Sequence, residues 1–422
     1  MNISILTGWI SRAAAMIFSL IGTRYLIELI GINNYAAHAV IMSLCAWIVI
    51  LNFGIPSTIQ NIIAKRRELG LDCIRLNKTA FRLIITIYII LIPILLIGAI
   101  LIKNIIFESN VYLSNYVIFI YLIGFLTSGF ILFFTQTLYA IHKPIWPNIL
   151  SGILSAITLL GVIILRAFDE KSLTLIALIY SFPQLLIFAI LISNYEWKNW
   201  DRYDTTSLHE IVNKAKGFLL FSILGTATLS VDYIILSRIV MPVEISIYNI
   251  VQKVFMIILI AYGIILTSSW TTISELMHSC RFREVILLIY KLLRLGCILI
   301  FSIGVFFVYF TEEIIFFLSN GKITYEEKFL SSLFLLYISI RIFTDTYATV
   351  LLSNDNTNMV NLTIPIQCCL GIFLQYQLSK LYGVEGILIG LIFSFILTAT
   401  WVLPFKFYKL VKIRNKEINK FN

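Results

Sequence analysis

The residues of this chain that could do chemistry are charged side chains set within long apolar segments. Such a charge at the centre of a bilayer costs at least about 2.5–3.5 kcal/mol, so it usually faces a partner or a water-filled cavity. If the apolar segments span a membrane, these side chains are therefore the candidate functional residues. They are Arg12, Arg24, Glu28, Asp232, Arg238, Lys253, Arg341 and Asp345.

The composition indicates that lipid surrounds most of the chain. Hydrophobic residues make up 59% of the 422 residues and charged residues only 13%. Soluble proteins are roughly 45–50% apolar and about 25% charged, and they need those charges to cover their surface. The cysteines form no CxxC pair and the histidines have no metal-ligand spacing. We therefore expect no metal and no other cofactor.

Apolar segments long enough to cross a bilayer recur along the whole chain. A crossing helix needs about 20 mainly apolar residues. The pattern predicts an all-α integral membrane protein with about twelve transmembrane helices. The predicted spans are 3–30, 36–64, 79–102, 116–141, 148–168, 173–193, 216–240, 245–272, 285–310, 329–352, 358–380 and 385–407.

Lysine and arginine are distributed unequally between the predicted loops. With the N-terminus placed inside, the inner loops and tail hold eighteen basic residues and the outer loops hold six. Basic residues concentrate in cytoplasmic loops of membrane proteins. This bias predicts that both termini are cytoplasmic, and it accounts for much of the net charge of +10.

A weak internal repeat divides the chain into two halves of six helices. Tyr180-Ser181-Phe182 matches Phe393-Ser394-Phe395 at an offset of 213 residues. Parallel repeats of this kind place a substrate site between the two halves. The predicted parts are an N-terminal lobe at 1–193, a cytoplasmic linker at 194–215, a C-terminal lobe at 216–407 and a basic tail at 408–422.

The first span carries two arginines with different surroundings. Arg12 lies about 15 Å along the helix, near the middle of a ~30 Å apolar core, and has no acid three or four residues away. It either faces a cavity or ties the helix to another one. Arg24 and Glu28 are four residues apart and can form a local ion pair. Alternatively, Arg24 faces the cavity, and Glu28 tunes the charge that Arg24 presents there.

The second half carries the remaining charges. Arg341 and Asp345 repeat the four-residue spacing, and the aspartate could exchange a proton. Asp232 and Arg238 are six residues apart, so they cannot pair with each other. We assign a substrate-binding cavity to Arg12, Arg24, Asp232, Arg238, Lys253 and Arg341, and ion or proton coupling to Glu28, Asp232 and Asp345. Structural salt bridges between helices are the alternative for each of these residues.

The sum of these intramembrane charges is positive, because there are five basic residues and only three acidic ones. A cationic cavity in a low-dielectric surrounding attracts an anionic substrate. Diphosphate suits it well, because the guanidinium fork binds phosphate oxygens in pairs.

Four short motifs carry a family resemblance over the whole chain. They are Leu29-Ile30-Gly31-Ile32-Asn33-Asn34-Tyr35, Leu51-Asn52-Phe53-Gly54-Ile55, the segment from Asp232 to Arg238, and Tyr382-Gly383-Val384-Glu385-Gly386. The pattern resembles the Wzx-type O-antigen and polysaccharide flippases of the multidrug/oligosaccharidyl-lipid/polysaccharide exporter superfamily. The chain departs from that pattern at Glu28, where arginine is usual, and at Ala36, where glycine is usual.

The resemblance implies two six-helix lobes in a MATE-like arrangement around a cationic cavity. It implies a flippase that moves undecaprenyl-diphosphate-linked oligosaccharide from the cytoplasmic to the periplasmic leaflet of a bacterial inner membrane by alternating access. A proton or sodium gradient would drive it. The implied partners are the lipid-linked oligosaccharide, membrane lipids, and polymerase and chain-length proteins of the pathway, with no nucleic acid.

Two other function classes stay open from the sequence. One is a small-molecule or multidrug antiporter of the same superfamily. A cationic interior would disfavour cationic drugs as its substrates. The other is a membrane polysaccharide polymerase, an enzyme that typically carries a large periplasmic loop. The longest predicted outer loop here, 311–328, is short. The chain also has no P-loop, HExxH or GxSxG motif, and we expect that it is not an enzyme.

Overall fold

The computed structural model describes residues 2–68, 71, 73–106, 114–141, 143, 145–193, 204–278, 281–325, 327–352 and 363–421. Helices dominate these residues, and no strand occurs among them. The predicted all-α membrane fold is confirmed. The helices are α1 (Asn2–Ile48), α2 (Ile55–Glu68), α3 (Ile74–Ile106), α4 (Asn115–Ala140), α5 (Ile145–Ala167), α6 (Leu173–Ser193), α7 (Thr205–Ser230), α8 (Asp232–Ile239), α9 (Pro242–His278), α10 (Phe282–Leu299), α11 (Val305–Tyr309), α12 (Thr311–Leu318), α13 (Phe329–Leu352), α15 (Ile364–Leu397) and α16 (Ala399–Phe421), with single turns η1 (Val49–Asn52) and η2 (Ile300–Gly304).

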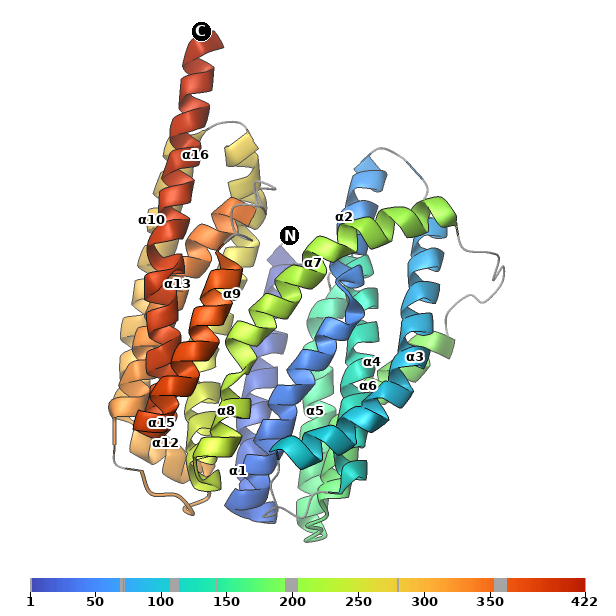
Figure 1. Ribbon diagram of the computed structural model, residues 1–422, viewed down its shortest axis with the longest axis vertical. Helices are drawn as coiled ribbons and strands as arrows, with labels where there is room; N and C mark the ends of the chain where they lie inside the picture. Colours follow the sequence, from blue (N-terminus) through green and yellow to red (C-terminus); the bar gives the residue numbers. More distant parts are fainter. Residues whose placement is uncertain are drawn as a thin grey trace. The chain divides into compact units, whose positions relative to one another are not determined.

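The chain divides into two compact units, Met1–Thr226 and Ala227–Asn422. The boundary falls inside α7, later than the linker expected at 194–215. Residues 194–203 of that linker lie outside the described residues, and the rest belongs largely to α7. Figure 1 shows the helices of each unit; the second unit ends in α16, whose last turns include residues 408–421 of the expected basic tail.

The number of membrane crossings follows from helix length. The described residues contain ten candidate spans, and two of them, Ile10–Asn52 and Ile364–Lys412, are 43 and 49 residues long. At 1.5 Å per residue each is about 65 Å or more, twice the ~30 Å apolar core of a bilayer. Glycines with positive φ break both segments, Gly31 at 79° and Gly383 at 57°. Counting each as two crossings gives ten plus two, the twelve that the apolar pattern predicts.

The first unit is built around α4. This helix packs against α6, α2 and α3, while α1 packs along α5. Phenylalanines fill the space between them: the ring centroids of Phe81 and Phe130 are 5.3 Å apart, and those of Phe130 and Phe188 are 4.9 Å apart. Edge-to-face aromatic pairs at such distances add about 0.5–1.5 kcal/mol each to area burial. They give the unit a tightly packed apolar interior.

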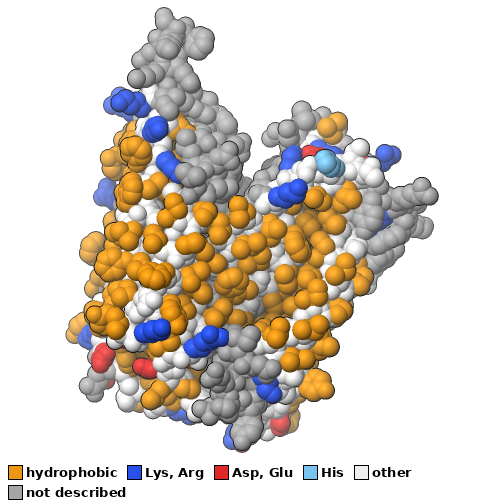
Figure 2. All heavy atoms as spheres, viewed as in Figure 1, with side chains coloured by type: hydrophobic (Ala, Val, Ile, Leu, Met, Phe, Trp, Pro, Cys, Tyr) orange, Lys and Arg blue, Asp and Glu red, His pale blue; other side chains and the backbone are white. Residues whose placement is uncertain are grey.

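The second unit is built around α13, which packs against α9, α15, α16 and α10. On the face that Figure 2 shows, apolar side chains cover the middle of each unit and charged side chains gather toward the ends. Large apolar side chains such as Ile89, Ile90 and Phe301 are 64%, 59% and 73% exposed. Lipid solvates such side chains, and the exposed apolar belt is the surface that a membrane protein needs.

The two arms of α15 pack backbone against backbone after the turn at Gly383. A Cβ at Gly386 would lie 2.1 Å from the carbonyl oxygen of Leu378, and one at Gly390 would lie 2.5 Å from the backbone nitrogen of Gln375. Small residues allow this close approach of helices in membranes.

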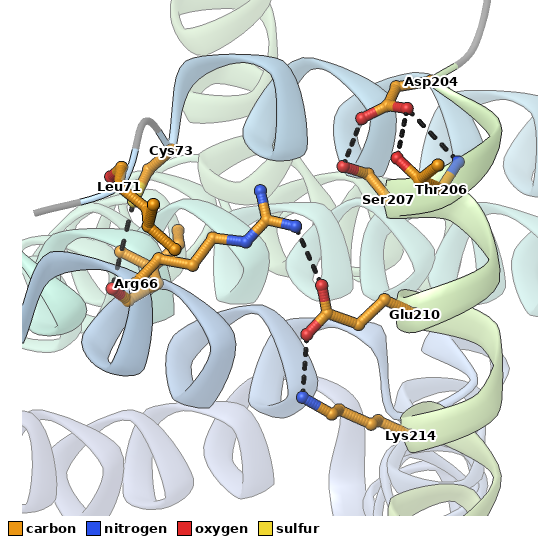
Figure 3. A network of polar contacts seen from close by, with 9 residues as sticks. Arg66, Leu71, Cys73, Asp204, Thr206, Ser207, Glu210 and Lys214 are labelled. Atoms are coloured by element: carbon orange, nitrogen blue, oxygen red, sulfur yellow. Dashed lines mark hydrogen bonds and ion pairs between the residues drawn. The ribbon is translucent and has the colours of Figure 1, made fainter. Parts of the chain in front are cut away.

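Polar contacts on α7 fix its first turns against α2 (Figure 3). Glu210 accepts from Arg66 of α2 at 2.8 Å and from Lys214 one turn later at 2.8 Å. The two cations, Lys214 most strongly, hold the pKa of the Glu210 carboxyl below its ordinary value. These pairs are partly exposed, so each contributes at most about 1 kcal/mol.

Asp204 caps the start of α7. Its carboxylate accepts from the hydroxyls of Ser207 at 2.5 Å and Thr206 at 2.6 Å, and from the Thr206 backbone nitrogen at 3.2 Å (Figure 3). The hydroxyl bonds lower the pKa of Asp204 from 3.8 to about 2. Because the folded pKa is depressed, the cap stabilises the helix end above about pH 4 and is lost as the pH falls toward 2.

Two variants test the hairpin in α15. Gly386→Ala and Gly390→Ala should each lower the unfolding midpoint in detergent by several degrees, because overpacking typically costs about 1–3 kcal/mol. Gly98→Ala and Gly263→Ala are the controls, since a Cβ at either position meets nothing within 4 Å. Equal midpoints for the two pairs of variants would show that the two arms of α15 are not in contact.

A second test concerns the cap of α7. Asp204→Ala should increase deuterium uptake by the backbone of residues 205–210 at neutral pH, because loss of a capping side chain costs about 1 kcal/mol locally. Asp204→Asn should keep most of the protection, because asparagine caps about as well as aspartate. Unchanged uptake in the alanine variant would mean that the cap does not hold this helix end.

Candidate functional site

Asp232 lies at the first residue of α8 and is only 4% exposed. Its Oδ2 accepts from the hydroxyl of Tyr248 at 2.8 Å and from Nε2 of Gln252 at 3.3 Å. The backbone nitrogen of Tyr233 donates to Oδ1 at 2.8 Å. An acid in the first turn also interacts favourably with the helix dipole. The carboxylate is thus held by three neutral donors and a helix N-terminus.

A second layer of hydrogen bonds supports this carboxylate. Tyr233 donates its hydroxyl to Oε1 of Gln252 at 2.6 Å, and Nδ2 of Asn249 donates to the same tyrosine oxygen at 2.5 Å. Positions 248, 249 and 252 share one face of α9, which therefore presents a polar stripe to α8. Sequence reasoning found Asp232 but missed Asn249 and Gln252, although their spacing within an apolar helix is the signal that could have found them.

Arg341 and Asp345 of α13 form the predicted ion pair. Nη2 and Nε of the arginine reach Oδ2 and Oδ1 at 3.1 and 3.2 Å. Nη1 donates to the hydroxyl of Tyr337 at 2.9 Å, and the guanidinium lies 5.5 Å from the ring centroid of Phe395. The side chains are 16% and 35% exposed. The structure therefore gives Arg341 a neutralising partner within its own helix, and its substrate role stays a prediction.

These two groups lie within electrostatic range of each other in the second unit. Tyr248 interacts electrostatically with both Asp232 and Tyr337, and Tyr337 interacts with Arg341 and Asp345. A proton or charge change at Asp232 would therefore be felt at the ion pair on α13. Of the predicted site residues, this brings together Asp232, Arg341 and Asp345.

Arg238 and Lys253 are the other predicted cations of the second unit. Arg238 occupies the last turn of α8, is exposed, and interacts electrostatically with Tyr376 of α15. The ammonium of Lys380 lies 3.9 Å from the ring centroid of Tyr376. Lys253 is partly buried on α9, next to Gln252 of the Asp232 network.

Arg12 lies in the first unit at the contact between α1, α4 and α5. It forms a hydrogen bond with Tyr139 of α4, whose hydroxyl donates to Oδ1 of Asn148 at 2.8 Å. Its neighbour Ser11 fixes α1 to α5 by accepting from the backbone nitrogen of Gly152 at 2.9 Å. The described groups around Arg12 at this contact, such as Tyr139 and Asn148, are therefore neutral.

Glu28 has a partner that sequence reasoning missed. Nη2 of Arg166, at the end of α5, reaches its Oε1 at 3.0 Å, and the same guanidinium stacks 4.5 Å above the ring of Tyr25. Arg24 is half-buried on the same helix, twelve residues or about 18 Å beyond Arg12. The two arginines of α1 therefore occupy different depths of the first unit. Among the residues that the structure describes, no group of three or more His, Cys, Asp or Glu side chains could hold a metal ion.

The ion pair on α13 can be tested by removing its members separately and together. Arg341→Ala or Asp345→Ala leaves one half-buried charge without its partner, which costs up to about 3 kcal/mol, whereas the double variant removes both charges. We expect each single variant to lower the unfolding midpoint more than the double variant does. Arg281→Ala is the control, because its pair with Glu284 is 59% and 47% exposed. Additive losses in the double variant would show that the pair is not coupled.

No family model matches the chain, but full-length relatives do. The chain is 29% identical over 429 aligned positions to the "Putative O-antigen export protein" of Yersinia pseudotuberculosis, covering 98% of each protein. It is 26% identical to the "Putative O-antigen transporter" of Salmonella typhi, covering 94% of each. The similarity thus spans nearly the whole length of these relatives.

Solved structures share the fold at low sequence identity. An inward-facing multidrug resistance MATE family transporter of the MOP superfamily matches with a TM-score of 0.74, at 11% identity, over 95% of this chain and 96% of that one. The lipid II flippase MurJ in its inward closed conformation also gives 0.74, at 14% identity, over 97% and 88%. The MATE-like fold is therefore established. The relatives named for O-antigen export and transport, similar over nearly their whole length, confirm the resemblance that the sequence motifs carry.

Proposed function

We propose that this protein is a flippase for lipid-linked oligosaccharide, the precursor unit of O-antigen or a similar surface polysaccharide. The observation that carries the proposal is the similarity over 98% of the chain to a protein named for O-antigen export. The fold, shared with transporters and with a lipid II flippase, supports a transport role. Both findings favour translocation over an enzymatic reaction.

The proposed substrate is undecaprenyl-diphosphate-linked oligosaccharide, and its diphosphate is the group that arginines would bind. Arg341 already carries an ion pair with Asp345, and Glu28 is neutralised by Arg166. Arg12 is held beside neutral groups, and Arg238 is exposed at the end of α8. A guanidinium fork binds phosphate oxygens in pairs. Because of these positions, within the first span and at the exposed end of α8, Arg12 and Arg238 are the favoured diphosphate ligands, supported by Arg24 and Lys253.

Coupling to a proton or sodium gradient is proposed for the acids. Asp232 is the favoured coupling residue, because three neutral donors hold it and because it interacts electrostatically with Tyr337, the hydrogen-bond partner of Arg341. Glu28 and Asp345 already sit in ion pairs, Glu28 with Arg166 of α5 and Asp345 with Arg341 of its own helix. A change of charge at Asp232 would reach three helices of the second unit, which gives a route from ion binding to movement.

The proposed setting is the bacterial inner membrane, with both termini in the cytoplasm and transport by alternating access toward the periplasmic leaflet. The Lys and Arg bias of the loops supports this orientation. Polymerase and chain-length proteins would use the lipid-linked oligosaccharide after it has reached the periplasmic leaflet. The second candidate, a multidrug antiporter, rests on the shared MATE fold alone.

Complementation in a bacterial strain that lacks its own O-antigen flippase tests the proposal. Expression of this chain together with its own polysaccharide genes should restore surface polysaccharide. No restoration, combined with resistance to cationic drugs, would favour the antiporter. Accumulation of the lipid-linked precursor on the cytoplasmic leaflet of a deletion strain would support the flippase.

Two arginine variants test the substrate-binding assignment in the same strain. Arg12→Ala and Arg238→Ala should each reduce surface polysaccharide at least about tenfold, because a lost bidentate phosphate contact costs 1.5–3 kcal/mol. Both variants should still be present in the membrane at the normal level. Arg281→Ala is the matched control, since its guanidinium is exposed and paired with Glu284. Normal display by both variants would remove these arginines from the site.

A further inference from the structure

His38 is a titratable side chain buried in the first unit, and the transport proposal above gives it no role. It is 4% exposed and lies on the arm of α1 that follows the turn at Gly31. Its Nδ1 lies 2.7 Å from the hydroxyl oxygen of Tyr121 on α4. Histidine is the side chain whose ordinary pKa places its change of charge between about pH 5 and 8. An ionisable side chain buried within a membrane span is a candidate for function.

Three tyrosine rings pack against this imidazole, one from each of three helices. The ring centroids of Tyr180 on α6, Tyr121 on α4 and Tyr35 on α1 lie 4.6, 5.7 and 6.1 Å from that of His38. An aromatic ring attracts a cation within about 6 Å of its centroid. The tyrosine rings and the Tyr121 hydroxyl can therefore stabilise an imidazolium in a place where burial alone would oppose the charge.

The helix segments around His38 carry no other full charge. α4 and α6 contain no Asp, Glu, Lys or Arg, and neither does α1 after Gly31. The titratable groups that face the cluster are the three tyrosines and Cys45, which interacts electrostatically with Tyr121. α5, which packs along the earlier arm of α1, contributes Arg166, and that guanidinium is paired with Glu28. In such a low-dielectric surrounding, one added proton changes the local field strongly.

The internal repeat places a tyrosine of the same position beside a titratable group in each unit. Tyr35 and Tyr248 are 213 residues apart, the offset that relates the two halves. Tyr248 donates its hydroxyl to Asp232, whereas Tyr35 forms a hydrogen bond with Thr23. The tyrosine of the first unit thus contacts a threonine where its counterpart contacts an acid. His38, one turn beyond Tyr35, is the group that can change its charge there.

We propose that His38 is a proton-binding residue of the transport cycle and that its protonation clamps the second arm of α1 to α4 and α6. The inference rests on the proposed flippase function and extends proton coupling to the first unit. In the neutral imidazole, Nδ1 can accept from the Tyr121 hydroxyl. In the imidazolium both ring nitrogens carry hydrogen, so Nδ1 donates to the Tyr121 oxygen. This charge-assisted hydrogen bond is stronger than the neutral one.

The break at Gly31 allows such a clamp to cause movement. Gly31 has a φ of 79° and separates two arms of α1 that have different partners. The first arm is attached to α5 through Ser11 and Glu28, and the second arm is attached to α4 through His38. Helices bend most readily at such interruptions. A stronger or weaker attachment at His38 would therefore change how the second arm is held relative to the first.

The predicted topology places the cluster toward the periplasmic side of the membrane. His38, Tyr121 and Tyr180 lie two, five and seven residues beyond the predicted outer ends of their spans, at 36, 116 and 173. At 1.5 Å per residue, these positions are about 3–11 Å deep. In the proposed orientation, protons from the periplasm would reach His38 over a short distance.

The experiment is a pH titration of the full-length protein in nanodiscs, with isotope-labelled histidine followed by NMR. The chain has four histidines, and the His38 signal is the one absent from His38→Gln. Its chemical shift should change with one inflection between about pH 5 and 8. Tyr180→Leu should move the inflection about half a pH unit lower, because the imidazolium loses one aromatic contact. His209→Gln is the control, since it removes an exposed histidine on α7 and should leave the His38 signal unchanged.

Translocation of a fluorescent lipid-linked oligosaccharide in liposomes gives the second readout. A proton gradient should accelerate translocation by the unchanged protein and by His209→Gln, and this acceleration should be lost in His38→Gln. Glutamine can keep a hydrogen bond to Tyr121 but cannot take up the proton. Loss of the acceleration at an unchanged unfolding midpoint therefore separates proton binding from a structural role.

The inference is overturned if the His38 signal does not titrate in that pH range. It is also overturned if His38→Gln responds to the proton gradient like the unchanged protein, or if only a sodium gradient accelerates translocation. The NMR titration needs no substrate, so the two proposals can fail separately. A titrating His38 in a protein that moves no lipid-linked oligosaccharide would support the proton site and contradict the flippase proposal.

Discussion

The constraint on which this structure depends is that polar groups surrounded by lipid must find their partners inside the protein. Backbone groups are satisfied by helices, and polar side chains by contacts between neighbouring helices. Asp232 shows the result in the second unit, because α8 is held to α9 through Tyr248 and Gln252. Ser11 does the same for α1 and α5 in the first unit. Helix packing and site geometry thus have one cause.

The same constraint sorts the intramembrane charges into two groups. Arg341 pairs with Asp345 within α13, whereas Arg166 pairs with Glu28 between α5 and α1, and both pairs neutralise charge. Asp232 and Arg12 instead have neutral side chains as hydrogen-bond partners. The transport proposal therefore rests on fewer residues than the positive charge count of the sequence suggests. For the proposed substrate and coupling sites these are Arg12 and Arg238, with Arg24 and Lys253 in support, and Asp232.

Local features were predictable from the sequence and long-range ones were not. Apolar lengths predicted the spans, with breaks that fall near Gly31 and Gly383, and four-residue spacing predicted the Arg341–Asp345 pair. Both follow from the geometry of one helix. The Arg166–Glu28 pair joins residues 138 positions apart, and the hydrogen bond from Tyr248 to Asp232 joins α9 to α8. Only the packing of helices brings such residues together, and the hydrophobic pattern does not specify it in that detail.

The most direct measurement of the central claim uses purified protein in liposomes that carry a fluorescent undecaprenyl-diphosphate oligosaccharide. A membrane-impermeant quencher or glycosidase added outside reports how much of the labelled lipid has changed leaflet. The account predicts protein-dependent translocation that is faster with an imposed proton or sodium gradient and absent in Arg12→Ala/Arg238→Ala. Equal rates with empty liposomes, or full activity of that double variant, would contradict it.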